Sequence, residues 1–357
     1  MSKYRKYLEF AALFLLAGLI IWWFGRRLDW DQVKLAIRKS DWRLILAAAV
    51  VILIAYLWRA VRWQALLKPL TEVSLREVWV ATCVGFGAIL LIGRAGEVVR
   101  PVVLPMRDHR VRPAASFVTI MIERLYDSVT VVLLFALSLF WLRPAGGGGP
   151  DLARERIAGT VLVVLLIVAV SLLIWFRKRS QTVIGWLDRR INSRSDLGVR
   201  VKHAILSTLE QLATALSVLS NVRLLALTIF WSVAMWGSVC VANLLVCRAF
   251  GVPFGFSQVF FVLGWSMVGS AVPTPGGAAG AFHAVTAAAL VLLGVGRDQA
   301  AAMAIIMHLV DFAPAAMVGL FYFLRGEVNL ERLRALISVK AVEHAVEDEK
   351  VVMAESS

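Results

Sequence analysis

Residues 224–247 read LLALTIFWSVAMWGSVCVANLLVC, a run without a charged side chain. About 20 apolar residues in an α-helix, rising ~1.5 Å each, cross the ~30 Å hydrocarbon core of a bilayer. Only helices and closed barrels satisfy their backbone hydrogen bonds inside lipid, and this run is too long and too uniformly apolar for a barrel strand. The stretch therefore predicts a transmembrane α-helix.

Similar runs occur elsewhere in the chain. Residues 157–176 carry no charge, and residues 8–24 and 42–58 carry one charge each. Hydrophobic residues make up 60% of the 357 residues, whereas a soluble domain is nearer half apolar. The sequence therefore predicts an all-α, polytopic integral membrane protein of the cell (inner or plasma) membrane, with about eight transmembrane helices.

The net charge of +14 fits a membrane protein better than a nucleic-acid-binding protein. Basic loops obey the positive-inside rule and contact anionic headgroups, so membrane lipids are the expected partners and nucleic acid is not. Cys83, Cys240 and Cys247 lie in apolar surroundings and form no CxxC pair, which gives no support for a metal site or a disulfide framework. We expect no cofactor.

Loop charges indicate the orientation. Residues 177–202 are strongly basic, so we expect this stretch and both termini in the cytoplasm. Residues 26–43 are also basic, although alternation of the spans places them outside. We expect one transmembrane domain at 1–325, which includes a cytoplasmic amphipathic loop at 177–222, and a short charged cytoplasmic tail at 326–357.

Two apolar stretches do not read as simple spans. Residues 77–93 are interrupted by Gly85 and Gly87, and residues 256–272 run into a Pro/Gly-rich sequence. Proline removes a backbone donor and glycine loosens a helix, so both are predicted to be re-entrant or broken helices. Each of these segments follows one uninterrupted span and precedes another. The span before the first segment and the span before the second cross the membrane in opposite directions, which predicts an inverted repeat. Matched interrupted segments are typical of transporter binding sites.

Charged residues gather after the first interrupted segment. Arg94, Glu97 and Arg100 fall at i, i+3 and i+6, close to one face of a helix. Two guanidiniums beside one carboxylate could hold a phosphate bidentately, with Glu97 orienting the two forks. An ordinary cytoplasmic loop with surface ion pairs is the alternative.

A second charged cluster, Glu123, Arg124 and Asp127, lies inside a long apolar run. Charges within a membrane are unfavourable and usually functional, which makes these residues candidates for headgroup binding. Two alternatives are open: the span starts near residue 122, so that the cluster lies at the interface, or Arg124 pairs with Glu97.

Arg59 and Arg62 close the second span. They would anchor the helix at the interface or contact a phosphate. The candidate lipid-headgroup residues are therefore Arg59, Arg62, Arg94, Glu97, Arg100, Glu123, Arg124 and Asp127.

The Pro/Gly-rich sequence is a candidate gate. Small residues permit close backbone approach, and a helix restarting after Gly277 offers free N–H groups and its positive end to an anion. A tight loop between two spans is the alternative. The residues of this broken-helix gate would be Pro273, Pro275, Gly276, Gly277 and Gly280.

Three further polar residues lie in the C-terminal spans. His308 and Asp311, at i and i+3, would form an intramembrane pair or, together with His283, a proton relay. Structural pairing of His308 with Asp311, and simple packing of His283, are the alternatives.

The ordered motifs resemble a known family. The matching pieces are Arg59-x-x-Arg62-Trp63-x-x-Leu66-Leu67, Arg94-x-Gly96-Glu97-x-x-Arg100, Glu123-Arg124-x-x-Asp127 and Pro273-x-Pro275-Gly276-Gly277-x-x-Gly280. Across nearly the whole chain this order resembles the lysylphosphatidylglycerol synthase transmembrane region, or flippase-like domain, family. The resemblance implies a multi-helix membrane fold that moves or binds phospholipids or isoprenoid-linked lipids. Family members usually have proline where Gly93 stands and glutamate where His283 stands.

Two classes of function follow from these patterns. The first is a flippase-like lipid transporter that binds an anionic headgroup between the two interrupted segments. The second is a non-transporting accessory protein that binds lipid or a partner lipid-modifying enzyme, with homo-oligomerisation left open. The chain contains no HExxH, GxSxG or Walker motif and no counterpart of the family's aminoacyl-transferase domain, so we do not expect an enzyme.

Overall fold

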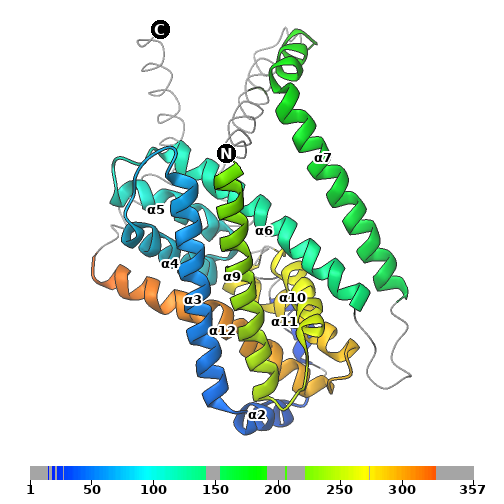
Figure 1. Ribbon diagram of the computed structural model, residues 1–357. Coiled ribbons are helices and arrows are strands. Elements are labelled where there is room, and N and C mark those ends of the chain that lie inside the picture. The colour runs from blue at the N-terminus through cyan, green and yellow to red at the C-terminus, as the bar shows by residue number, and fades with distance from the viewer. Residues whose placement is uncertain are drawn as a thin grey trace.

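The computed structural model describes residues 28–141, 153–190, 222–272 and 274–326, together with Leu206 and short pieces between residues 15 and 26. The regular elements in this part of the chain are helices: α2 (Trp30–Lys39), α3 (Trp42–Leu67), α4 (Leu75–Ile92), the 3₁₀ helix η1 (Gly93–Val98), α5 (Val99–Arg107), α6 (Pro113–Trp141), α7 (Ala153–Arg190), α9 (Val222–Ala249), α10 (Phe256–Ser270), α11 (Pro275–Leu292) and α12 (Arg297–Leu324). Figure 1 shows them as a bundle with α7 at its edge.

The outer surface of the bundle is that of a membrane protein. Among the described helices, α3, α9 and α12 are long and apolar enough to cross a membrane. They expose large apolar side chains such as Leu46 (68%), Phe230 (59%) and Met317 (64%), a surface that suits lipid rather than water. The chain is thus an all-α integral membrane protein. The total of about eight spans stays a prediction, because most of residues 8–24 lie outside the described residues.

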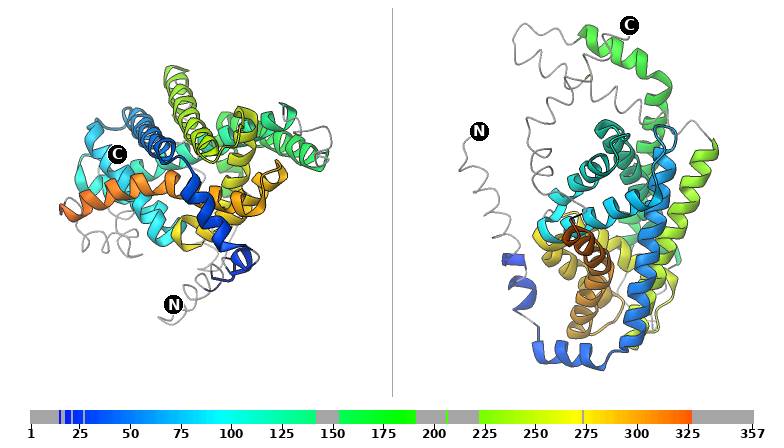
Figure 2. Two further views of the ribbon diagram at one scale, coloured as in Figure 1. Left: turned by 90° about the horizontal axis from the view of Figure 1, so that it is seen from below. Right: turned by 90° about the vertical axis from the view of Figure 1, so that its left-hand side faces the viewer.

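The most extensive helix-to-helix contact in the described part of the bundle joins α3 and α9, which run antiparallel. The Asp41 N–H at the start of α3 donates to the Ala249 carbonyl at the end of α9, at 2.9 Å. Farther along, the Trp58 and Trp231 rings stack with their centroids 5.2 Å apart. Figure 2 shows the two helices side by side in both views. The opposite directions predicted for these two spans are therefore confirmed.

A hairpin formed by α10 and α11 begins and ends at the same end of the bundle. The Gln299 side chain, after the hairpin, donates to the Phe250 carbonyl before it, at 2.9 Å. Ser266 and Thr286 join its two arms through their hydroxyls, 2.8 Å apart. The 15 residues of α10 extend about 22 Å, less than the ~30 Å of the hydrocarbon core. Helix α10 is therefore shorter than a full transmembrane span, as a re-entrant segment requires.

A second hairpin, α4–η1–α5, enters from the opposite end. Arg107 near the end of α5 bonds to Glu77 near the start of α4, at 2.5 Å. Its chain reversal begins at Gly93, in η1, and α4 is continuous through Gly85 and Gly87, so the predicted interruption at those two glycines is wrong. Gly85 serves close packing instead, because a Cβ there would lie 2.6 Å from the Cβ of Arg100.

The two halves pack in a matching pattern. Helix α4 packs on α12, and α10 packs on α6. Both contacts use a glycine: a Cβ on Gly319 would overlap the Cys83 carbonyl, and one on Gly264 would overlap the Phe135 ring. Each half thus consists of a long helix, a hairpin and another long helix, the arrangement expected of an inverted repeat.

The first part of the predicted amphipathic loop at 177–222 is helical. Helix α7 packs against α6 and continues to Arg190 across a kink at Arg179 (φ −123°, ψ 19°), so residues 177–190 are helical. Apart from Leu206, the rest of this predicted loop up to residue 221 lies outside the described residues, as does the tail after Gly326.

Candidate functional site

Charged residues of α3 and α6 meet in the interior of the bundle. Arg59 Nη1 lies 3.0 Å from Asp127 Oδ2 and 3.3 Å from Glu123 Oε1. Arg62 Nη2 lies 2.8 Å from Asp127 Oδ1, and its Nη1 donates to Ser232 Oγ of α9 at 2.8 Å. Residues three or four apart share one helix face, which is why both arginines of α3 reach both carboxylates of α6.

Arg100 of α5 completes this ion network. Its Nη1 and Nη2 atoms donate to the two oxygens of Glu123, at 2.5 and 2.9 Å, as a bidentate fork. Its Cζ lies 4.2 Å from the centroid of the Trp63 ring, whose Nε1 donates to Thr119 Oγ1 at 3.0 Å. The sequence predicted that Glu97 would orient this fork. Glu123 takes that place, because Arg100 lies on the buried face of α5 that packs on α4 and α6.

The ion network carries an excess of positive charge. Its side chains are at most 11% exposed. Three guanidiniums face two carboxylates, which leaves one positive charge without a partner among these five residues. Arg124 adds another at the edge, with a side chain 34% exposed and Nη2 3.7 Å from Glu123 Oε1. Unbalanced buried charge is unfavourable, so these five residues favour a further anionic group nearby, and the carboxylates of Glu97 and Asp311 line the adjoining cavity.

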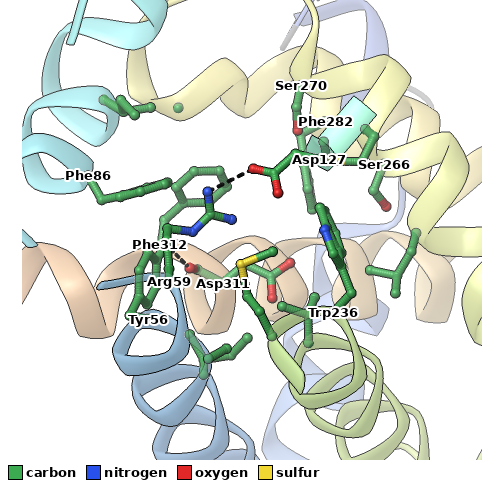
Figure 3. A pocket seen from close by; sticks show the side chains of 18 of the residues that line it. Tyr56, Arg59, Phe86, Asp127, Trp236, Ser266, Ser270, Phe282, Asp311 and Phe312 are labelled. Atoms are coloured by element: carbon green, nitrogen blue, oxygen red, sulfur yellow. Dashed lines mark hydrogen bonds and ion pairs between the residues drawn. The ribbon is translucent and has the colours of Figure 1, made fainter. Parts of the chain in front are cut away.

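A cavity opens beside the ion network (Figure 3). Its empty volume, open mouth included, is about 1030 Å³. Side chains from α3, α4, η1 and α6 line one part of it, and side chains from α9 to α12 line the rest. In Figure 3 the Arg59 guanidinium points into the cavity and reaches Asp127. Mostly apolar walls with a few convergent polar groups are typical of binding sites for small molecules.

Asp311 of α12 stands on another part of the cavity wall. Its Oδ1 accepts a hydrogen bond from Asn243 Nδ2 of α9 at 3.3 Å. Its backbone carbonyl accepts one from the Tyr56 hydroxyl of α3 at 2.9 Å. The carboxylate is therefore held by neighbouring helices, at a position where it faces the cavity.

The histidines of the predicted relay lie together, apart from Asp311. The ring centroids of His283 and His308 are 4.8 Å apart, and His308 Nε2 lies 3.2 Å from the Gly277 carbonyl oxygen. His308 faces α11, whereas Asp311, three residues later, faces α9, so the predicted pair between them is replaced by these other contacts. Among the described residues, no group of three or more His, Cys, Asp or Glu side chains could hold a metal ion.

The tip of the α10–α11 hairpin turns through left-handed backbone. Gly276, Gly277 and Ala278 have φ angles of 72°, 64° and 65°. Glycine adopts this conformation freely, whereas alanine is disfavoured there by about 1–2 kcal/mol. Gly277 and Ala278 both line the cavity, so strained backbone forms part of its wall. Such strain is concentrated at functional sites in proteins.

The remaining predicted residues are distributed as follows. Pro273 lies outside the described residues, and so do the side chains of Arg94 and Pro275. Gly280 lies within the regular part of α11. Glu97 lines the cavity and also a second, shallower pocket.

Trp236 is a cavity residue that the sequence did not single out. It is 6% exposed, it lines the cavity, and its Nε1 has no hydrogen-bond partner among the described atoms. Figure 3 shows the indole nitrogen on the cavity side. A tryptophan in an apolar helix ordinarily indicates packing or an interfacial anchor, so no sequence signal could have found it. Buried indole N–H groups usually have a partner, and this one is available to a ligand.

Two comparisons with known proteins bear on this arrangement. The family model "Lysylphosphatidylglycerol synthase TM region" matches residues 10–319. A UPF0104 membrane protein from Pyrococcus horikoshii is 22% identical over 349 residues, which cover 94% of this chain and 99% of that protein. Both matches include the helices that carry the ion network and the cavity.

Proposed function

The chain belongs to the lysylphosphatidylglycerol synthase TM region family, and from that premise we propose that it binds a membrane lipid by its phosphate-bearing headgroup and carries it between leaflets. The headgroup occupies the cavity between the two halves. The lipid is an anionic phospholipid or an isoprenoid-linked lipid. On this proposal the protein is a transporter and not an enzyme, and it resides in the cell membrane with both termini in the cytoplasm.

The positive excess of the buried ion network is the observation that carries the proposal. Arg59 and Arg124 line the cavity directly, and Arg62 and Arg100 lie behind them. A planar guanidinium binds phosphate oxygens through paired N–H donors. Because carboxylates hold these arginines in place, the donors are oriented before the ligand arrives, which reduces the entropy lost on binding.

The position of the cavity supports transport rather than static binding. Hairpins that enter from opposite ends of the bundle meet at this cavity, and residues from both tips, Glu97 and Gly277, line it. A binding site at the interface of two inverted halves can open to either side by rocking of one half against the other. The left-handed turn at Gly276–Ala278 is a candidate for the moving part.

A leaflet-to-leaflet assay tests this proposal. Phosphatidylcholine vesicles would carry the reconstituted protein and a fluorescent phosphatidylglycerol or polyprenyl phosphate, and a membrane-impermeant quencher would report which leaflet holds the label. We expect the wild type to move at least one of the two anionic probes. Arg124→Lys keeps the charge but loses the fork, and it should slow transport by about tenfold.

The control is Lys34→Gln, on an exposed side chain of α2, which should transport like the wild type. Wild-type rates for Arg124→Lys would contradict the bidentate role. A wild type that retains lipid but moves neither probe would contradict transport and favour an accessory protein that binds lipid or a partner enzyme.

A further inference from the structure

The second pocket lies between η1, α5 and α6, on the outer surface of the bundle. It is lined by Glu97, Val98, Pro101, Phe117, Ile120, Met121 and Arg124, and its empty volume, open mouth included, is about 580 Å³. Apart from Glu97 and Arg124, the residues that line this pocket are all apolar. Met121 and Val98 are 58% and 42% exposed, and on a membrane protein such side chains face lipid. We refer to this pocket as the side groove.

The side groove adjoins the cavity. Glu97 and Arg124 line both. Along α6, residues 117, 120, 121, 124 and 127 are spaced three or four apart, so they share one face of the helix. This face extends over about 15 Å. It is apolar at Phe117, Ile120 and Met121, and becomes ionic at Arg124 and Asp127.

An apolar stretch followed by an ionic one matches the two parts of a single amphiphile. A headgroup in the cavity must be connected to hydrocarbon chains that remain in the bilayer, and those chains need an apolar exit from the bundle. The side groove supplies such an exit directly beside the cavity. Arg124 and Glu97 would then lie beside the junction between the polar headgroup of the lipid and its hydrocarbon chain.

We propose that the side groove binds the first part of a hydrocarbon chain of the lipid whose headgroup occupies the cavity. This inference rests on the proposed function and adds to it a second binding subsite, one that recognises the chain and not the headgroup. Binding energy there comes from van der Waals packing of CH₂ groups against Ile120, Met121 and Val98, because a chain that leaves bilayer hydrocarbon is not transferred from water.

Filling the groove with a large side chain tests the inference. Met121→Trp should leave a monodisperse protein, because Met121 is exposed on the bundle surface, yet the indole should occupy the groove. Native mass spectrometry of protein purified in a mild detergent would measure the lipid retained per chain. We expect at least a fivefold loss. Leu133→Trp is the matched control, on the same helix at 43% exposure and outside both pockets, and it should retain the wild-type amount.

A second form of the experiment avoids any effect on folding. Met121→Cys and Leu133→Cys would be purified and then modified with hexyl methanethiosulfonate. The native cysteines at 83, 240 and 247 are buried, so the introduced thiol is the reactive one. Modification should displace lipid from Met121→Cys and not from Leu133→Cys.

The outcomes separate this inference from the proposed function. If Met121→Trp and modified Met121→Cys retain lipid like the wild type, while Arg124→Gln loses it, the chain subsite is wrong and the headgroup site stands. If Leu133 variants lose lipid as strongly as the Met121 variants, the groove has no special role. A wild type that retains no lipid contradicts both the groove and the proposed function.

Discussion

Glu123 has no exposed surface, and its carboxylate contacts guanidiniums from α3 and α5. At the scale of single residues, the stability of the buried ion network therefore depends on Glu123 more than on any one arginine. The sequence could indicate that charges inside an apolar run have a function. It could not indicate which charges pair, because Arg59, Arg100 and Glu123 come together only through the packing of three helices.

Glu123→Gln should destabilise the protein strongly. Three buried guanidiniums would then share one carboxylate, and breaking a buried ion pair typically costs about 3–5 kcal/mol. We expect a lower thermal unfolding midpoint in detergent and a smaller monodisperse yield. Asp31→Asn is the control, because its pair with Lys34 is almost fully exposed and such pairs contribute little. An unfolding midpoint for Glu123→Gln equal to that of the wild type would show that the network is not structural.

Trp236→Phe should weaken lipid binding without unfolding the protein. The change keeps an aromatic ring in the wall and removes the Nε1 donor, a loss of about twofold to tenfold in affinity for one hydrogen bond. Trp265→Phe is the matched control, since the Nε1 of Trp265 also has no partner among the described atoms but Trp265 does not line the cavity. Equal effects of the two changes on lipid retention would contradict a ligand contact at Trp236.

At the scale of elements, the hairpin tips show what sequence patterns can and cannot provide. The Pro/Gly-rich sequence predicted an interruption, and the chain does turn at Gly276 and Gly277. The glycines of α4 gave the wrong position for the other break, because glycine serves both chain reversal and close helix packing, and only the partner helix decides which. The left-handed conformation of Ala278 has no sequence signal.

Ala278→Gly should not destabilise the protein, although glycine in a helix usually does. It removes a left-handed penalty of about 1–2 kcal/mol, which offsets the added freedom of glycine in the unfolded chain. Ala288→Gly, at an exposed position in the same helix, should lower stability by about 1 kcal/mol. Thermal unfolding of the two variants side by side measures the difference. A lower midpoint for Ala278→Gly than for Ala288→Gly would mean that the strain inferred at the tip is absent.

At the scale of the whole molecule, the proposed lipid-binding cavity lies between the two inverted halves. The apolar run at 224–247 predicted α9 to within two residues at each end, because helix length in a membrane follows from the thickness of the bilayer. The run at 42–58 predicted the start of α3 but stopped nine residues before its end at Leu67. The cavity could not be predicted in this way. It arises from contacts such as α4 with α12 and α10 with α6, which join segments more than 100 residues apart and leave no periodic pattern.

The most direct test is to ask whether a lipid headgroup reaches the interior. The protein would be placed in phosphatidylcholine nanodiscs that contain phosphatidylglycerol with a photoreactive diazirine on its headgroup, illuminated, digested and mapped by mass spectrometry. We predict labelling at cavity residues of both halves, such as Tyr56, Trp236 and Phe312, and its suppression by excess unlabelled phosphatidylglycerol. Labelling confined to the exposed ends of the helices, and unaffected by the competitor, would contradict binding of the headgroup in the cavity.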